Sequence, residues 1–226
     1  MNATPEPTRV TEDYLAVIWK ASEWPDDGHT PATSAIASAL GVSLSTVSAQ
    51  LKRLATDGLI DYHPYGAIAL TAEGEMIARQ VVRRHRILET FLVEHLGLAW
   101  DEVHEEADKL EHATSDRLIA RMDDMLGPPA VDPHGDPIPC DIHEAPDPGV
   151  PLTRCERGES VVISRVSDEN PDILRYCAKR MLAPGTRITI LEEMDSTGLM
   201  SIEGSGQRVE LSAQIANAIR AVPEAA

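Results

Sequence analysis

Aromatic residues and cysteines are scarce in this chain of 226 residues. It has one Phe and 4% aromatic residues in all, so its core must be built from aliphatic side chains and alanine. The three cysteines, Cys140, Cys155 and Cys177, are an odd number at unrelated spacings, and no C-x-x-C pair occurs. These features argue against a disulfide framework and against a zinc ribbon.

Basic residues are also few, with 20 Lys and Arg against 37 Asp and Glu and a formal net charge of −17. This excess argues against a nonspecific nucleic-acid coat and against an anionic membrane surface as partner. It is compatible with carboxylates that take up cations. No apolar run approaches the length of a membrane span, and the N-terminus lacks the basic and apolar segments of a secretory signal. We therefore expect a soluble, cytoplasmic protein with no membrane partner.

Side chains that can bind metals gather on one face of a helical stretch. Four such side chains lie within roughly a 100° arc when each residue turns the helix by about 100°. They are His104, Asp108, Glu111 and His112. Upstream, His85 and Glu89 repeat the pattern at i, i+4. Imidazole and carboxylate aimed the same way suit a nitrogen and oxygen metal site. The alternative is a pair of amphipathic helices with histidines among their solvated charges.

The N-terminal third has the pattern of a helix-turn-helix followed by a β-hairpin. Apolar spacing and turn residues predict helices over 11–22, 32–40 and 43–57, and strands over 59–63 and 67–70. Thr11 is the expected N-cap of the first helix, and Ser43 or Ser45 that of the third. This order is typical of a winged helix-turn-helix.

The rest of the chain divides into a helical part and a β-rich part. We expect a long helix over 71–96, a helix capped by Asp101 that carries the metal face, and a helix over 115–126. Eight prolines within residues 127–151 indicate a linker or an irregular arm. Short strands are then expected over 160–166, 187–191, 199–202 and 207–210, with a helix over 171–180 and a helical turn near 212–219.

The third helix is the expected recognition helix for DNA. Its candidate contacts, together with one in the hairpin turn, are Ser43, Ser45, Thr46, Ser48, Gln50, Lys52, Arg53 and Tyr65. Small hydroxyl side chains suit phosphates and thymine methyl groups better than bidentate base readout. The alternative is that these serines and threonines merely cap and solvate a helix. Residues 1–80 hold five Lys or Arg against ten Asp or Glu, so DNA binding requires something that offsets the acid, such as a divalent cation.

Five sequence pieces, in this order, carry a family resemblance. They are Thr11-Glu12-Asp13-Tyr14-Leu15, Val42-Ser43-Leu44-Ser45-Thr46-Val47-Ser48, Arg84-His85-Arg86-Ile87-Leu88-Glu89, Val103-His104-Glu105-Glu106-Ala107-Asp108 with Glu111-His112, and His134-Gly135-Asp136-Pro137-Ile138-Pro139. Over nearly the whole chain, the sequence resembles the diphtheria toxin repressor family of metal-activated transcriptional repressors.

The resemblance implies a mainly α fold with β structure, in three domains. These are a winged helix-turn-helix domain at 1–80, a helical dimerisation and metal-binding domain at 81–146 and, after a linker at 147–157, a small SH3-like β-barrel at 158–226. It also implies a homodimer that binds a double-stranded DNA operator and needs no organic cofactor.

By resemblance, one metal site joins the first helix to the helical domain. Its matching positions are Asp13, Asp108, Glu111 and His112. Iron-sensing members carry Met at the first of these positions and Cys at the second, and carboxylates favour harder ions such as Mn²⁺. The chain thus resembles the manganese-sensing branch. We expect Mn²⁺ as the cofactor, with Fe²⁺ as the alternative and other divalent transition metals binding in vitro.

A second metal site matches His85, Glu89 and His104 by resemblance. Iron-type members add two ligands from the barrel, where this chain has Arg165 and Asp168, so Asp168 is the candidate. Manganese-type members can instead use an arm, where Asp132 and His134 lie. Asp132 and Asp136 also replace the anion-binding Ser and Asn of iron-type members.

Two other functions compete with a manganese-dependent repressor of manganese homeostasis genes. His104-Glu105-x-x-Asp108 is one residue from the HExxH hydrolase motif, but the second histidine is replaced, so we expect no enzyme. A repressor that answers an organic ligand would need an aromatic or apolar pocket, for which one Phe is poor provision. Metal titration of DNA binding and of catalysis separates the three.

Overall fold

A computed structural model describes residues 7–24, 32–63, 67–140 and 146–224. The chain forms two compact units that divide after His85. No single helix in these ranges is both long and apolar enough to cross a bilayer. A pair of short helices, Thr33–Ala39 and Leu44–Thr56, meets the criteria of length and composition together but is bent by 107°.

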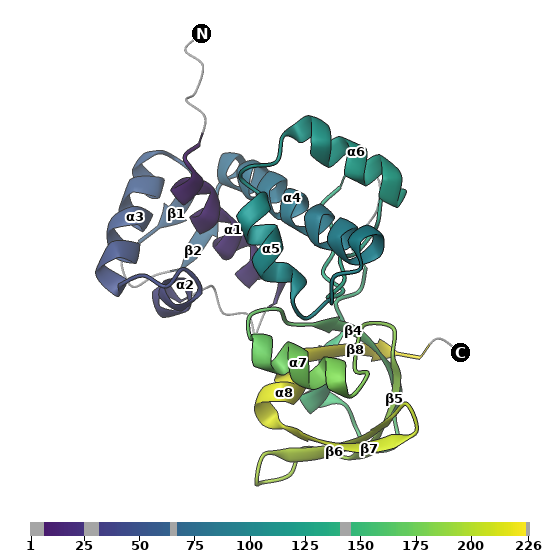
Figure 1. The fold of residues 1–226 in the computed structure, drawn as a ribbon. Helices are drawn as coiled ribbons and strands as arrows, with labels where there is room; N and C mark the ends of the chain where they lie inside the picture. The colour runs from purple at the N-terminus through teal and green to yellow at the C-terminus, as the bar shows by residue number, and fades with distance from the viewer. Residues whose placement is uncertain (1–6, 25–31, 64–66, 141–145, 225–226) are drawn as a thin grey trace. The chain divides into compact units, whose positions relative to one another are not determined.

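The first unit has the expected order of a winged helix-turn-helix (Figure 1). Its elements are α1 (Arg9–Glu23), α2 (Thr33–Ala39), α3 (Leu44–Thr56), β1 (Ile60–Tyr62), β2 (Ile68–Leu70) and the start of α4 (Ala72–Leu96). The two strands pair antiparallel. Gly41 makes the turn between α2 and α3 at φ +63°, where glycine carries no steric penalty. The core is mainly aliphatic, with Leu15, Ile36 and Leu51 fully buried.

Side-chain caps set two helix starts in this unit. Ser43 caps α3 by accepting a hydrogen bond from the Thr46 amide, which confirms one of the two expected caps. α1 starts two residues earlier than expected. Its N-cap is Thr8, whose hydroxyl accepts from the amide of Thr11 at 3.3 Å, so the expected cap lies one turn inside the helix.

The second unit begins with the rest of α4 and two further helices, α5 (Val103–Leu110) and α6 (Asp116–Leu126). Buried Ile87 and Leu88 of α4 pack with Ala107, Ile119 and Ile138. Ser115 caps α6, and Gly127 ends it in a left-handed conformation. α5 begins without the expected aspartate cap, because residue 102 occupies the cap position and makes no side-chain cap bond.

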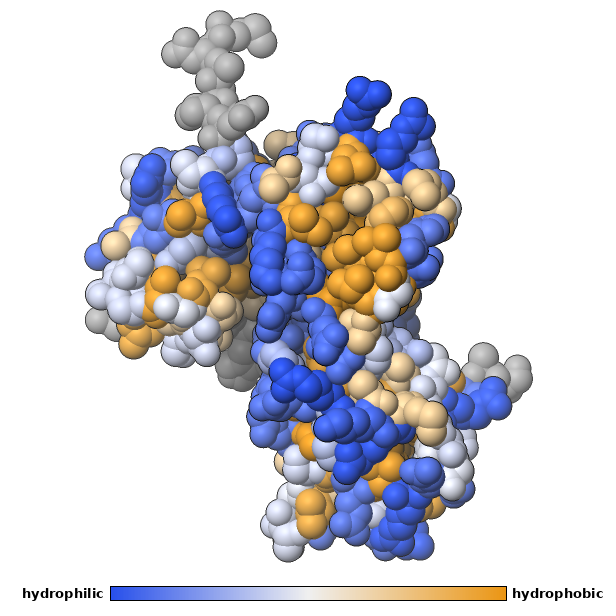
Figure 2. All heavy atoms as spheres, viewed as in Figure 1, coloured by the Kyte–Doolittle hydropathy of each residue, from blue (hydrophilic) through white to orange (hydrophobic). Residues whose placement is uncertain are grey.

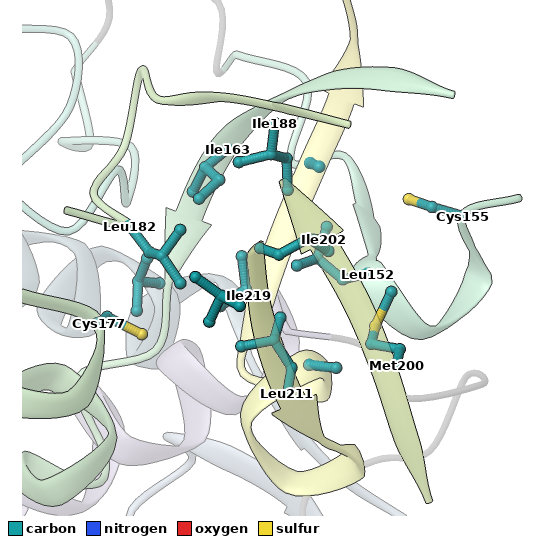
Figure 3. Close-up of a cluster of buried hydrophobic side chains, with 14 of the residues drawn as sticks. Leu152, Cys155, Ile163, Cys177, Leu182, Ile188, Met200, Ile202, Leu211 and Ile219 are labelled. Carbon is teal, nitrogen blue, oxygen red and sulfur yellow. The ribbon is translucent and has the colours of Figure 1, made fainter. Parts of the chain in front are cut away.

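A six-stranded antiparallel sheet completes the second unit. The elements are β3 (Val150–Pro151), the 3-10 turn η1 (Leu152–Arg154), β4 (Ser160–Val166), α7 (Pro171–Lys179), β5 (Arg187–Glu192), β6 (Leu199–Gly204), β7 (Gln207–Ser212), α8 (Ala213–Asn217) and β8 (Ile219–Pro223), with the strands in the order β3-β8-β4-β5-β6-β7. Figure 3 shows its aliphatic core, in which Ile163, Ile202 and Leu211 are fully buried. The expected fold class is thus confirmed.

Residues 130–138 of the proline-rich segment form an ordered arm. Its two ends meet in an antiparallel bridge between Val131 and Pro137, and the amide of Ile138 donates to the carbonyl of Ala130. The arm also docks on the sheet, because the amide of Val166 in β4 donates to the carbonyl of His134 at 2.9 Å. The arm is therefore held against the β-rich part by backbone contacts.

Replacement of Gly135 by Ala tests this docking. Gly135 and Gly158 have φ of +89° and +88°, so Ala at either position meets left-handed strain of roughly 1–2 kcal/mol. Only at Gly135 would the new Cβ overlap a carbonyl oxygen, that of Ser164 in β4, whereas Gly158 has open space. We expect Gly135→Ala to lower the free energy of unfolding by at least about 2 kcal/mol more than Gly158→Ala. Urea unfolding of both variants measures this, and equal losses would contradict the docked arm.

Candidate metal centre

The buried carboxylate of Glu89 lies at the centre of a group of nitrogen and oxygen donors in the second unit. Glu89 lies on α4 and is 0% exposed. Its Oε1 is 3.0 Å from Nδ1 of His104 on α5, and its Oε2 is 3.7 Å from Nδ1 of His134 in the arm. One carboxylate therefore faces two imidazoles from two other segments.

His104 brings a further carboxylate to this group. Its Nδ1 is also 3.2 Å from Oδ2 of Asp168, which follows β4, and its Nε2 is 3.7 Å from Oδ2 of Asp108. Glu89, His104 and Asp168 present ligand atoms within 4.8 Å of one another. His85 is buried one helical turn before Glu89 on α4. The structure thus brings together three of the predicted second-site residues, and Asp168 is the barrel residue that joins them.

His134 is fully buried beside the same carboxylate. Its Nε2 is 2.7 Å from the carbonyl oxygen of Trp100, in the loop between α4 and α5. Burial by itself lowers the pKa of His134, but the carboxylate of Glu89 and the charges of Asp132 and Asp168 outweigh it and raise the pKa to about 10. Since 3.7 Å exceeds hydrogen-bond distance, we attribute this effect to the nearby negative charge.

Asp132, Asp136, Arg86 and Arg165 form a buried ion network next to this group. Nε of Arg86 is 3.4 Å from Oδ2 of Asp132, and its NH2 is 3.7 Å from Oδ2 of Asp136. Arg165 of β4 also pairs with Asp136. The guanidinium of Arg165 thus points to the arm, and this residue is no metal ligand. Burial raises the pKa of Asp132, and the charges of Asp136 and Glu89 add to this effect.

The donors around Glu89 fit a divalent cation. Arginines neutralise the arm carboxylates, whereas Glu89 and Asp168 face the imidazole of His104. Two carboxylates match the charge of a divalent ion, and a mixed set of imidazole and carboxylate suits Mn²⁺ or Fe²⁺. Burial of ionised groups is otherwise costly.

The predicted first-site residues of the second unit lie at the C-terminal end of α5. Oε1 of Glu111 is 3.0 Å from Nε2 of His112. Glu111 and Asp108 also have ligand atoms within 4.8 Å of each other. Asp13 lies on α1 in the first unit, and its membership of this group remains a prediction.

The expected DNA-contacting hydroxyls gather at the start of α3. Oγ of Ser43 lies 2.8 Å from both the Ser45 and the Thr46 hydroxyls, and all three residues are exposed. Lys52 and Arg53 are exposed too, while Ser48 and Gln50 are half-buried and Tyr65 lies outside the described residues.

Sequence reasoning missed two features of these sites. Leu44 is 56% exposed at the start of α3, where an apolar side chain can meet a thymine methyl group. An apolar residue directly after the N-cap is the signal that could have revealed it. The second feature is the Trp100 carbonyl beside His134. It is a backbone group, so no residue pattern reveals it.

Three family models match successive parts of the chain. The DNA-binding domain of the iron dependent repressor matches residues 7–68, its metal binding and dimerisation domain residues 71–140, and a FeoA domain residues 150–223. The chain is 33% identical to the diphtheria toxin repressor of Corynebacterium efficiens over 224 residues, which cover 93% of this chain and 94% of that protein. It is 31% identical to the iron-dependent repressor IdeR of Mycobacterium tuberculosis over 223 residues, with 93% and 95% covered.

Solved structures match along nearly the whole chain as well. A manganese-dependent transcriptional repressor in complex with manganese has a TM-score of 0.87 and 44% identity, and the match covers 95% of this chain and 100% of that one. ScaR with bound Zn²⁺ has a TM-score of 0.80 and 30% identity, with 96% and 100% covered.

Removal of the Arg86 charge tests the buried network. Arg86→Met leaves the buried carboxylates of Asp132 and Asp136 without a shared cation, so we expect it to lower the free energy of unfolding by about 3–5 kcal/mol. Arg175 pairs with Asp172 on the surface of α7, and Arg175→Met should cost less than about 1 kcal/mol. Urea unfolding of the metal-free variants measures both. Similar small losses in the two variants would show that the buried network contributes little.

Proposed function

This chain belongs to the iron-dependent repressor family, the family of the diphtheria toxin repressor, and we propose that it is a manganese-responsive member. Proteins of this family are metal-dependent, DNA-binding transcriptional repressors and not enzymes. We infer that the chain acts in the cytoplasm as a homodimer on the operators of manganese homeostasis genes. The observation that carries this proposal is the group of donors around the buried Glu89 carboxylate, in a chain that also has a winged helix-turn-helix.

The choice of manganese rests on two aspartates. Asp13 and Asp108 stand where iron-sensing relatives carry Met and Cys by resemblance, and carboxylate oxygens favour harder ions than thioether or thiolate sulfur. The solved relative with 44% identity is described as manganese-dependent. The relative from Mycobacterium tuberculosis is described as an iron-dependent repressor, so Fe²⁺ remains the alternative.

We propose that Asp13, Asp108, Glu111 and His112 form the site that couples metal to DNA binding. Asp13 belongs to the DNA-binding domain and the other three to the helical domain. A bound divalent cation would supply the positive charge that holds these carboxylates together. Without this charge, repulsion among the carboxylates would loosen the hinge between the two domains. In the proposed second site, His85, Glu89 and His104 are joined by Asp168 or by Asp132 and His134 of the arm.

The homodimer is proposed from an apolar surface of the helical part. Figure 2 shows apolar side chains gathered over the region of α4, α5 and α6. Leu96, Leu110, Leu118 and Met125 are exposed there, and exposed apolar patches mark interaction sites. A twofold dimer presents two α3 helices to successive major grooves, with a spacing that the domain angle sets.

Metal titration of DNA binding tests the proposed function. The full-length, metal-free protein should bind its operator fragment weakly, because its DNA-binding domain is acidic. Mn²⁺ should raise the affinity at least tenfold at the free Mn²⁺ concentrations that the cell maintains, whereas Fe²⁺ and Zn²⁺ at their own cellular concentrations should not. Fluorescence anisotropy measures this. DNA binding that ignores all three metals would overturn the proposal, and a response to Fe²⁺ alone at such concentrations would favour the iron alternative.

The double variant Asp13→Met with Asp108→Cys tests the basis of metal choice. It introduces softer ligands, so the same titration should show a shift of preference from Mn²⁺ toward Fe²⁺ and later metals. Asp101→Met with Asp116→Cys changes two aspartates outside the proposed sites and serves as the control. An unchanged preference in the first variant would show that ligand softness is not the selector.

Two matched glutamate variants separate the roles of the two sites. Glu111→Gln should abolish the Mn²⁺ response of DNA binding, since Glu111 belongs to the coupling site. Glu89→Gln should retain most of the response at saturating Mn²⁺, because Glu89 serves the second site within one unit. If Glu89→Gln is the more damaging variant in the anisotropy titration, the two roles are reversed.

A further inference from the structure

The outer face of α3 has an alanine at its centre. The inner face packs on the core of the first unit through three fully buried side chains, which are Val47, Leu51 and Leu54. At about 100° per residue, Ala49 lies roughly opposite these side chains on the helix. It is exposed, as are Ser45 one turn before it and Arg53 one turn after it. Ala49 therefore lies on the face that a recognition helix turns toward the bases.

Two polar side chains next to Ala49 are engaged with neighbours in the same domain. The hydroxyl of Ser45 lies 2.8 Å from Oγ of Ser43, which caps the helix. Nε of Arg53 lies 3.8 Å from Oδ2 of Asp57. The middle of the outer face thus offers a methyl group, whereas hydrogen-bonding groups lie toward its two ends.

The methyl group of Ala49 can recognise only one feature of the major groove. Alanine has no side-chain donor or acceptor, so Ala49 cannot distinguish bases by side-chain hydrogen bonds. The apolar group that base edges present in the major groove is the 5-methyl group of thymine. Because its side chain is a single carbon atom, an alanine also allows the helix backbone to approach the bases closely. An alanine at this position therefore favours a T·A pair.

Leu44 is the other exposed apolar residue of α3, but it lies on a different face. Its side chain is 56% exposed. It precedes the buried Val47 by three residues, which places the two side chains about 60° apart around the helix axis. Leu44 therefore borders the buried face, whereas Ala49 lies at the centre of the exposed face.

We propose that Ala49 is a specificity-determining residue that contacts the 5-methyl group of a thymine in each half of the operator. The inference rests on the proposed function, because it presumes that the chain binds an operator as a homodimer. In a twofold dimer the contact occurs once in each half-site, at the same position. The base pair that faces the second turn of α3 is then selected by a methyl contact and not by hydrogen bonds.

The test removes methyl groups from the DNA one position at a time. Manganese-loaded, full-length protein first selects its operator from a pool of random duplexes. Each thymine of that operator is then replaced, in both half-sites, by deoxyuridine, which lacks only the 5-methyl group. Fluorescence anisotropy should show one position at which this replacement lowers the affinity roughly threefold for each half-site, since one methyl contact is lost there.

Variants of α2 and α3 connect this position to Ala49. In Ala49→Gly, deoxyuridine at that position should have no further effect, even though glycine weakens the helix and lowers the affinity for all DNA. The matched controls are Leu44→Ala and Ala35→Gly, which removes an exposed methyl group from α2, and both should keep the full deoxyuridine effect. Ala49→Gln replaces the methyl contact by an amide that can pair with adenine, so it should also lose the effect. This variant serves if Ala49→Gly does not fold by circular dichroism.

Three outcomes overturn the inference. They are an operator in which no thymine responds to deoxyuridine, a deoxyuridine effect that persists in both Ala49 variants, and an effect that depends on Leu44 instead. If the selection enriches no sequence, the proposed function and this inference both fail. If the selected operator is bound equally well without Mn²⁺ and the deoxyuridine effect depends on Ala49, the proposed function fails and this inference stands.

Discussion

The burial of the Glu89 carboxylate is the constraint on which the second unit depends. Removal of an ionised carboxylate from water costs several kcal/mol unless charge and hydrogen bonds compensate. Here the compensation comes from imidazoles that belong to α5 and to the arm. Those segments must therefore converge on α4, and their aliphatic contacts through Ala107 and Ile138 allow them to do so. The same three segments therefore form the apolar packing of the unit and supply the charged groups of the candidate site.

A second buried carboxylate, that of Asp136, ties three segments together. It lies on the arm and faces Arg86 of α4 and Arg165 of β4. A carboxylate between two guanidinium groups is held by charge attraction and by the directional hydrogen bonds that the guanidinium groups donate. The arm is thus fixed at both sides, which keeps His134 in register with Glu89. In this chain the negative charge that faces Arg86 and Arg165 is the Asp136 carboxylate of the arm itself.

Periodicity and turn residues predicted most of the fold, because they report local constraints. The winged helix-turn-helix followed from apolar spacing and from Gly41, and Ser43 was one of two expected caps. The predicted start of α1 was wrong by a few residues, since Thr8 and Thr11 both suit an N-cap and the structure uses Thr8. Strand β8 (Ile219–Pro223) was not expected, because its pairing with β4 is a long-range contact that local sequence patterns do not report.

The candidate site was predictable in its ligand types but not in its connections. Helical spacing indicated Glu89 and His104 as metal-binding residues, and the resemblance added Asp168 and His134. The pairing of Arg165 with Asp136 was not predictable, since it joins residues from two expected domains. The same holds for the Trp100 carbonyl, because a backbone atom leaves no trace in residue identity.

The packing of Trp100 affects where a domain boundary can be drawn in this chain. Trp100 belongs to the loop between α4 and α5, yet its ring packs against the aliphatic core of the six-stranded sheet. The match to the FeoA domain begins only at residue 150. A fragment that ends there would leave the Trp100 side chain without the sheet core against which it packs. It would also leave Asp136 without its ion pair to Arg165. The domain boundary that the sequence match indicates therefore does not separate two independent parts of this protein. Replacement of the β-rich part would also require changes in the residues of the helical part that contact it.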